Sequence, residues 1–248
     1  MANALAQYED LMNLDHPHFI WMNYGLDGED FSWICEKLDE RWKYQMNLAR
    51  FTVRGLNLEG KRVLDTGCGR GGNCSFLARY HSPSEVVGLD QSQRQIEWCR
   101  QRFSADSLSF VAGDAQSLPF SDGVFDVVTN IESAPHYADK PRFYREVFRV
   151  LSPRGYFGHS SNYLHPAKVE ASIEAAGFRA VASTDITAGV IDALNKNVEN
   201  FKELMAEIAT SSEARRVGKL VQTALRDHIP KSFSSEHRYM SWVFQRMP

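Results

Sequence analysis

The chain has 248 residues, of which 43% are hydrophobic and 24% are charged, as in ordinary globular proteins. Its formal net charge of −3 and the lack of a Lys/Arg cluster disfavour a nucleic-acid partner, because phosphate binding leaves a basic footprint. No apolar stretch reaches the about 18 residues of a membrane span, and no signal peptide is recognisable. We therefore expect a soluble cytoplasmic protein that binds neither nucleic acid nor membrane.

The four cysteines, at positions 35, 68, 74 and 99, lack the paired spacing of a metal site or a disulfide framework. We expect free thiols in a reducing compartment.

Residues 1–57 are helix-prone and rich in aromatic side chains, and we expect them to form a helical cap. The aromatic residues are Phe19, Trp21, Tyr24, Phe31, Trp33, Trp42, Tyr44 and Phe51. Together they suggest an apolar wall for a bound molecule, although each one alone is more often a core residue. His16 and His18 invite a metal interpretation, but no carboxylate or cysteine partner can be assigned to them. We predict no metal site.

Across residues 58–187, short apolar runs alternate with helical patterns, which is typical of β-α units and a mainly parallel sheet. The strands are expected at 62–66, 85–89, 108–112, 125–130, 156–160 and 178–185. The helices between them are expected at 73–80, 92–103, 141–151 and 167–176. Turn residues mark 117–123 and Ser152-Pro-Arg-Gly155, where the third of these helices should stop.

Residues 188–233 indicate two polar-faced helices, at 191–208 and 212–228. A final strand is expected at 238–245, inside the last segment, 234–248. Since that strand returns to the sheet, the two helices should be an insertion that forms a second cap beside the site. We expect both caps to take part in substrate selection, and self-association through them is left open.

The central signal is the run Asp65-Thr-Gly67-Cys68-Gly69-Arg-Gly-Gly72, in which a strand leads into glycines and then into a helix. Glycines permit positive φ and the close approach of a ligand. The N-terminus of the following helix offers N–H groups to an anion or a polar tail. The same run satisfies the G-x-G-x-x-G pattern of dinucleotide sites, which by itself is weak evidence.

Two carboxylates narrow the choice of cofactor. Asp90, at the end of the second strand, suits the ribose hydroxyls of either NAD or S-adenosylmethionine. Asp65 favours S-adenosylmethionine, because a carboxylate there can hold the ammonium group of an amino-acid tail. In a dinucleotide site the same charge would repel the pyrophosphate.

Five motifs in order resemble class I S-adenosylmethionine-dependent methyltransferases of the small-molecule group called type 11. The resemblance covers residues 61–158, with weaker similarity up to Phe178 and at the last strand. The segments that match are Asp65–Gly71, Gly88–Asp90 for the ribose, Gly113–Ala115 for the adenine, Phe120–Asn130 at the sulfonium, and Arg145–Gly155 after it.

The resemblance implies a doubly wound α/β fold, Rossmann-like, with a seven-stranded and mainly parallel sheet that includes one antiparallel strand. The cofactor would lie across the carboxyl ends of the strands. By the same resemblance, Tyr24 would cover the cofactor, although an ordinary packing role fits it equally well. The cofactor-binding residues implied are Tyr24, Asp65, Gly67, Cys68, Gly69, Asp90, Gln91, Asp114, Ala115 and Asn130.

Transfer from a sulfonium is an in-line displacement, for which alignment alone can supply roughly 7–11 kcal/mol. An oxygen acceptor also needs a base, and His136, in the loop after the fourth strand, is the first candidate. His159 and His165 are weaker candidates. Glu132 is the second candidate catalytic residue, and it either lines the pocket or satisfies backbone N–H groups of its loop. Pro135 stands where similar enzymes carry a second histidine, and an acid after the next strand is absent, so a His–Asp relay is in doubt.

We therefore expect methylation of a small apolar metabolite of the natural-product type, with O-methylation first. C-methylation of a terpenoid, polyketide or indole-type acceptor, with or without cyclisation, is the second hypothesis, since aromatic walls can stabilise a cation. An NAD oxidoreductase is the third, but no hydride-transfer partner is recognisable. The loop after Asn130 lacks the paired prolines of enzymes that methylate adenine or glutamine.

Overall fold

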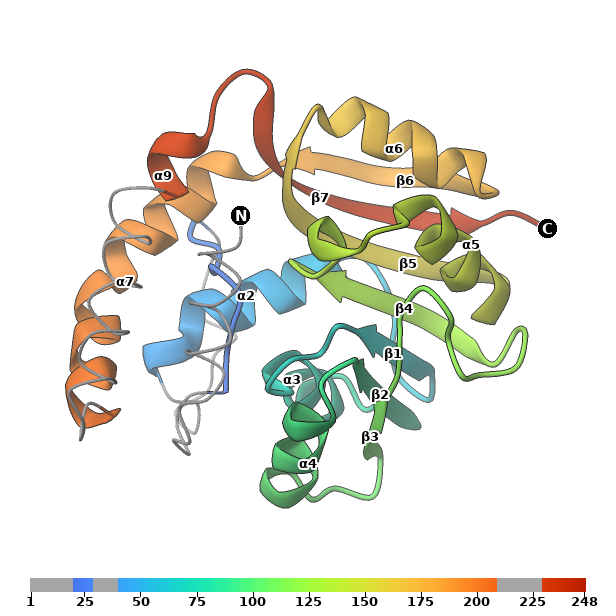
Figure 1. Cartoon of the computed structure of the whole chain (residues 1–248), viewed down its shortest axis with the longest axis horizontal. Helices are drawn as coiled ribbons and strands as arrows, with labels where there is room; N and C mark the ends of the chain where they lie inside the picture. The colour runs from blue at the N-terminus through green and yellow to red at the C-terminus, as the bar shows by residue number, and fades with distance from the viewer. Residues whose placement is uncertain (1–19, 29–39, 209–228) are drawn as a thin grey trace.

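The computed structural model describes residues 20–28, 40–208 and 229–248, and in them one sheet of seven strands (Figure 1). Its order is β3-β2-β1-β4-β5-β7-β6. Only β7 runs antiparallel, to both β5 and β6, while the other neighbours pair in parallel. The predicted fold class is confirmed. The strands are β1 (Arg62–Thr66), β2 (Glu85–Asp90), β3 (Leu108–Ala112), β4 (Phe125–Ile131), β5 (Leu151–Leu164), β6 (Phe178–Asp185) and β7 (His237–Arg246).

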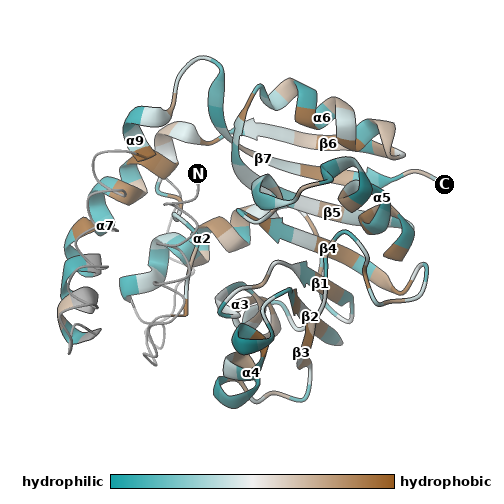
Figure 2. Cartoon of the chain, viewed as in Figure 1, coloured by the Kyte–Doolittle hydropathy of each residue, from teal (hydrophilic) through white to brown (hydrophobic). Residues whose placement is uncertain are grey.

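Helices cover both faces of the sheet. Each strand contributes side chains to both helix-covered faces, because neighbouring residues of a strand point to opposite faces. Val63 of β1 packs in a core shared with α2, α3, α4 and α7, whereas Leu64 packs in a second core with α5 and α6. Figure 2 shows hydrophobic residues along the central strands and hydrophilic ones on α4. The helices are α2 (Lys43–Thr52), α3 (Gly72–Tyr80), α4 (Gln93–Arg102), α5 (Lys140–Val150), α6 (Pro166–Ala175), α7 (Thr187–Ile208) and α9 (Ile229–Ser232), with 3₁₀ turns η1 (Glu40–Trp42) and η2 (Ala134–His136).

Side-chain caps and a proline set where two of these helices begin. Ser92 accepts a hydrogen bond from the backbone N–H of Gln95 at the start of α4, and Asp139 accepts one from Arg142 at the start of α5. Pro141 stands in the first turn of α5, where its missing N–H has no helical partner to lose. These local signals explain why the predicted helices lie within a residue or two of the observed ones.

The sequence analysis expected a turn at Ser152–Gly155 between a helix and a strand that begins at Tyr156. This expectation is wrong, because these four residues belong to the strand. Strand β5 begins directly at Leu151 and continues to Leu164. The four residues form an irregularity in the pairing with β4, and Arg154 takes a positive φ of 65° there. The strand extends far beyond the predicted Ser160 because β7 pairs with it from Tyr156 to Leu164.

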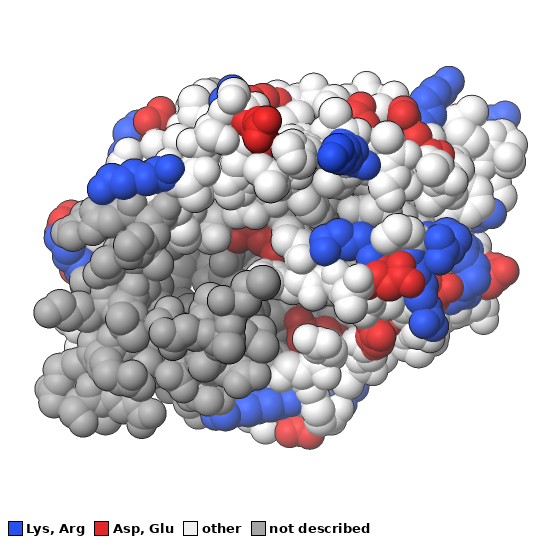
Figure 3. Space-filling model, turned by 45° about the horizontal axis from the view of Figure 1, so that its top comes forward, with Lys and Arg blue, Asp and Glu red and all other residues white. Residues whose placement is uncertain are grey.

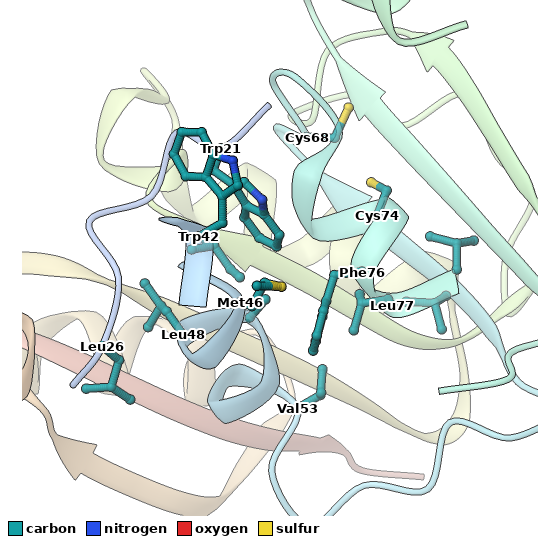
Figure 4. Packing of buried hydrophobic residues seen from close by; sticks show 14 of the residues in the cluster. Trp21, Leu26, Trp42, Met46, Leu48, Val53, Cys68, Cys74, Phe76 and Leu77 are labelled. Carbon is teal, nitrogen blue, oxygen red and sulfur yellow. The ribbon is translucent and has the colours of Figure 1, made fainter. Parts of the chain in front are cut away.

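The described part of the N-terminal region is not helical throughout. Residues 20–28 form no regular element, and α2 follows later. Figure 4 shows Trp21 and Trp42 beside Met46 of α2, with Phe76 of α3 facing them, so this region packs into the first core. Of the sequence expectations, those for His16, His18, Phe19, Phe31, Trp33, Cys35 and the helix at 212–228 lie outside the described residues.

Helix α7 matches the helix expected at 191–208 but begins earlier, at Thr187. Its first turns bury Val190 and Leu194 in the first core. None of the described helices combines the length and the apolar character needed to cross a lipid bilayer.

Candidate active site

The glycine turn connects β1 to α3 at the carboxyl end of the parallel strands. The backbone N–H groups of Gly67 and Cys68 both donate to the carbonyl oxygen of Leu89, at 2.7 and 2.9 Å, which fixes the turn against β2. Gly67, Gly69 and Gly71 all have positive φ, at 71°, 51° and 74°. The turn has the backbone conformation that only glycine adopts without strain.

Gly67 also lies in close contact with the loop that follows β4. A Cβ atom on Gly67 would stand 2.3 Å from Oγ of Ser133 and 2.9 Å from the hydroxyl of Tyr137. Contacts that short cannot be accommodated without movement of the loop. The glycine turn and the loop after β4 therefore form one closely fitted unit.

Asp65 lies beneath the turn and is 1% exposed. Its carboxylate accepts hydrogen bonds from Oγ1 of Thr129 at 2.7 Å and from Sγ of Cys74 at 3.4 Å. Burial raises its pKa to about 6, and the charge of Asp90 adds to the rise, while the hydrogen bonds oppose it. A buried carboxyl group whose ionised form is disfavoured gains most from a cation, such as the ammonium of an amino-acid tail.

Asp90 closes the other side of the turn. Its two carboxylate oxygens accept from the backbone N–H of Gly69 and of Ser92, both at 2.9 Å. Burial raises its pKa, and these two hydrogen bonds oppose the rise. Each oxygen keeps a lone pair with which to accept from a ribose hydroxyl. Asp90 can thus hold a nucleoside and shape the turn with the same carboxylate.

The remaining predicted contacts continue along the ends of β2 and β3. Gln91 and Asp114 are exposed, and Ala115 is buried. One oxygen of Asp114 accepts from the backbone N–H of Gln116 at 2.8 Å, which leaves the other oxygen for a ligand. Their positions agree with the expected nucleoside site, and their contacts with a cofactor stay predictions.

The three described cysteines of this region are buried thiols. Sγ of Cys99 donates to the carbonyl of Gly69 at 3.3 Å, and burial raises the pKa of Cys74 to about 12. Protonated thiols in such surroundings are unreactive. Cys99 contacts the turn through Gly69 and thereby supports it.

Asn130 braces the start of the loop after β4 and is fully buried. Its amide nitrogen donates to the carbonyl of Thr66 at 3.0 Å and to Oγ of Ser133 at 2.6 Å, and its oxygen accepts from the N–H of Ala134 at 3.1 Å. The side chain was expected to contact the cofactor. The structure shows it holding the loop to the end of β1, and a direct contact with a cofactor stays a prediction.

His136 ends the 3₁₀ turn η2 in the same loop and is exposed. Partial burial and the positive charge of Lys140 lower its pKa. The imidazole is therefore neutral near pH 7, which is the form that accepts a proton.

His159 is a core residue and not a base. It is fully buried in β5, with Nδ1 3.1 Å from the carbonyl oxygen of Asn130 and Nε2 2.9 Å from the hydroxyl of Tyr163. Its ring is stacked between Phe157 and Trp242, with centroids 5.3 and 5.7 Å away. Burial lowers its pKa to about 4. The expectation that it could reach an acceptor is wrong, because β5 extends past it into the sheet.

His165 precedes α6 with a positive φ of 58°, and its N–H donates to the carbonyl of Glu236.

Glu132 is the first residue after β4 and joins parts of the chain that are far apart. Its Oε1 accepts from the backbone N–H of Tyr24 at 2.9 Å and from the hydroxyl of Tyr239 at 2.7 Å. Burial raises the pKa of its carboxyl group to about 7, while the two hydrogen bonds oppose the rise. The sequence analysis missed Tyr239, because nothing in a strand pattern marks one tyrosine for a contact with a loop 107 residues earlier.

Within the described residues, no group of three or more His, Cys, Asp and Glu side chains is arranged to hold a metal ion. Figure 3 shows a hollow in the molecular surface with acidic atoms beside it, and on this face Lys and Arg side chains lie among Asp and Glu. A glycine cradle flanked by one buried and one half-buried carboxylate, Asp65 and Asp90, fits a nucleoside that carries an amino-acid tail.

Comparison with known proteins agrees with this geometry. Residues 64–158 match the model of a methyltransferase domain family. The chain is 36% identical over 194 residues to a fatty-acid O-methyltransferase of Mycolicibacterium smegmatis, which covers 77% of this chain and 70% of that protein. It is 38% identical over 172 residues to a probable phthiotriol/phenolphthiotriol dimycocerosates methyltransferase of Mycobacterium ulcerans, covering 68% of this chain and 66% of that protein. The matched segments thus span about two thirds of these relatives.

Solved structures share the fold over nearly the whole chain. A putative sarcosine dimethylglycine methyltransferase from Galdieria sulphuraria superimposes with a TM-score of 0.78 at 16% identity, covering 97% of this chain and 98% of that one. The [4+2]-cyclase SpnF gives 0.75 at 20% identity, with 99% and 96% covered. Fold and site define a Rossmann-like protein built for a nucleoside cofactor. The chain belongs to the S-adenosylmethionine-dependent methyltransferases, and S-adenosylmethionine is its cofactor.

Proposed function

We propose that this methyltransferase transfers the methyl group to an oxygen atom of a small apolar acceptor, of the lipid or natural-product type, with His136 as the base. The observation that carries the proposal is the placement of His136. It is an exposed, neutral imidazole on the loop whose Ser133 and Tyr137 pack against Gly67 of the cofactor turn. The relative named as a fatty-acid O-methyltransferase supports an oxygen atom on an apolar molecule as the acceptor.

The other residues have separate roles in this proposal. Asp65 binds the ammonium group of the cofactor, and Asp90 binds the ribose. Asn130 holds the loop so that an acceptor bound beside His136 lies in line with the methyl group. When bound, S-adenosylmethionine supplies a methyl group that is already activated, so this chain has only to align the acceptor and remove its proton.

The base is needed for some acceptors more than for others. A fatty acid is already ionised at neutral pH, whereas an alcohol or a phenol keeps its proton. Replacing His136 should therefore impair methylation of a hydroxyl group and leave methylation of a carboxylate nearly unchanged.

The test compares His136→Ala with the unaltered protein on long-chain fatty acids, long-chain alcohols and phenols, with product formation followed by mass spectrometry. We expect kcat with a hydroxyl acceptor to fall about 10²–10⁴-fold, and the affinity for S-adenosylhomocysteine to stay the same. His165→Ala is the matched histidine control and should retain activity. Equal loss on both acceptor types, or none on hydroxyls, would contradict the role of His136 as a base.

A further inference from the structure

Residues 20–28 form a cover over the glycine turn, and we call them the cover segment. A Cβ atom on Gly72 would stand 2.5 Å from the carbonyl oxygen of Ile20 and 2.8 Å from the ring of Trp21. A Cβ atom on Gly69 would stand 3.7 Å from Cγ of Met22, which is an ordinary contact distance. The cover segment thus packs directly on the turn that holds the methyl donor.

Hydrogen bonds fasten both sides of the cover segment. The amide of Asn23 donates to Oδ1 of Asn73 on α3 at 3.1 Å. Further along, the N–H of Leu26 donates to the carbonyl of Tyr44 at 2.8 Å, and the N–H of Asp27 donates to the carbonyl of Gly189 on α7 at 3.0 Å. Tyr24 lies between these fastenings, and its N–H donates to Glu132.

Backbone and side-chain contacts hold Glu132 in the position that receives this N–H. Its own N–H donates to the carbonyl of Ser160 at 2.9 Å, which continues the pairing of β4 with β5 by one residue. Its positive φ of 62° is unusual for a residue with a side chain and turns the carboxylate toward the cover segment. Tyr239, on β7 and fully buried, donates to the same oxygen, Oε1.

Tyr239 is itself fixed to the fold. Its N–H donates to Oγ1 of Thr187 at 2.9 Å, at the start of α7, and its ring packs 6.2 Å from that of Tyr24. The side chain of Tyr24 reaches Asn162 on β5. One carboxylate thus connects the cover segment, the loop of His136 and the last strand.

We propose that Glu132 is a positioning residue that fastens the cover segment over the methyl donor, with Tyr239 as its support. Both donors use Oε1, so the carboxylate acts here as a structural acceptor and not as a base. The inference rests on the methyl-donor site and is independent of the acceptor and of His136.

The experiment compares Glu132→Ala with Glu132→Gln, since glutamine keeps an oxygen that accepts from both donors at the same reach. Hydrogen exchange of the amides in residues 20–28 reports whether the cover segment is fastened, and calorimetry gives the affinity for S-adenosylhomocysteine. We expect Glu132→Ala to speed exchange at Tyr24 and to weaken binding about tenfold, as loss of a charge-assisted hydrogen bond predicts. Glu132→Gln should keep the protection, and its affinity should stay within about threefold.

Two further variants make the result independent of general destabilisation. Glu170 also accepts from a β7 side chain, Nε1 of Trp242 at 2.9 Å, but on the other face of the sheet. Glu170→Ala should lower the melting temperature without changing exchange in residues 20–28 or the affinity. Glu132→Asp keeps the charge and shortens the reach, so it should resemble Glu132→Ala, and it decides the matter if the alanine variant does not fold.

Two outcomes would overturn the proposal. One is unchanged exchange and affinity in both Glu132→Ala and Glu132→Asp. The other is loss of turnover in Glu132→Gln with full protection and affinity, which would make Glu132 a group that acts on the acceptor. Failure of the protein to methylate any oxygen acceptor would refute the proposed function and would leave both readouts of this experiment unaffected.

Discussion

The methyl-donor half and the acceptor half of the site are built in different ways. In the donor half, the contacts that shape the glycine turn join residues close in sequence, such as Gly69 and Asp90, 21 positions apart. We call the loop after β4 the acceptor half, because it carries the proposed base His136. In this loop Glu132 receives hydrogen bonds from residues 108 positions before it and 107 positions after it, and so joins the loop to the cover segment. The backbone conformation of the glycine turn is therefore set largely within one β-α-β unit, whereas the contacts of Glu132 depend on the whole fold.

This difference suggests how the two halves respond to change. The donor half depends on backbone conformation and close fit, so single atoms matter there. The acceptor half depends on side chains that reach across the sheet. Substitutions there should act by changing the position, the pKa or the length of these side chains.

The largest effect should come from Gly67→Ala, which tests the close fit between the halves. The added methyl group would stand 2.3 Å from Ser133 Oγ, at a φ of 71° that disfavours a side chain. Strain and overpacking together amount to several kcal/mol, so we expect the affinity for S-adenosylmethionine to fall at least about a hundredfold. Calorimetric titration measures this directly.

Gly60→Ala is the matched control for that variant. Gly60 has a nearly identical φ of 68°, and a Cβ atom there would have no neighbour within 4 Å. It should cost only about 1 kcal/mol of stability through backbone strain and should leave cofactor affinity unchanged. If both variants bind the cofactor equally well, the fit between Gly67 and Ser133 is not needed.

A smaller effect should follow from the acidity of Asp65. Because the pKa of its carboxyl group is raised to about 6, the group is increasingly protonated below that pH and loses its attraction for an ammonium group. We expect the affinity for S-adenosylmethionine to fall with decreasing pH, up to about tenfold per unit below pH 6. The charge of Asp90 and the thiol of Cys74 face the same group.

Titrations between pH 5 and pH 8 would check this dependence, with Asp65→Asn as the comparison. That variant should bind weakly and should lose the dependence near pH 6. If the affinity of Asp65→Asn still falls with decreasing pH near 6, the pH dependence arises from another titrating group.

The smallest effect on turnover should come from His159→Phe, which separates the two histidines near the acceptor half. The substitution keeps the stacking between Phe157 and Trp242 but leaves the carbonyl of Asn130 and the hydroxyl of Tyr163 without this partner. We expect the free energy of unfolding to fall about 1–3 kcal/mol, with kcat changed less than about twofold. Denaturant unfolding and steady-state kinetics would test it, and a loss as large as in His136→Ala would place His159 in the chemistry.

The sequence predicted the sheet and the conformation of the glycine turn well, because both depend on local signals. Glycines with positive φ, a carboxylate at each strand end and the alternation of strands and helices all act within about 30 residues. The last strand was expected from its residue pattern, and the presence of one antiparallel strand from the resemblance to the methyltransferases.

The acceptor half could not be predicted to the same depth. His159 looked like a candidate base because a histidine pattern does not show the strand partner that buries it. For Glu132, the two interpretations left open were a role at the pocket and satisfaction of backbone N–H groups. In the structure Glu132 accepts from the N–H of Tyr24, which lies outside its own loop, so neither interpretation named this contact. That donor comes from a distant segment, which sequence spacing could not indicate.

The position of β7 has a consequence for how the molecule assembles. This strand is the last in sequence, yet it lies inside the sheet between β5 and β6, so β6 has no neighbour until β7 is in place. The same strand carries the hydroxyl that supports Glu132. A nascent chain on the ribosome can form β1 to β5 in order. The pairing of its outer strand β6 and the hydrogen bond from Tyr239 to Glu132 must wait for residues 237–246.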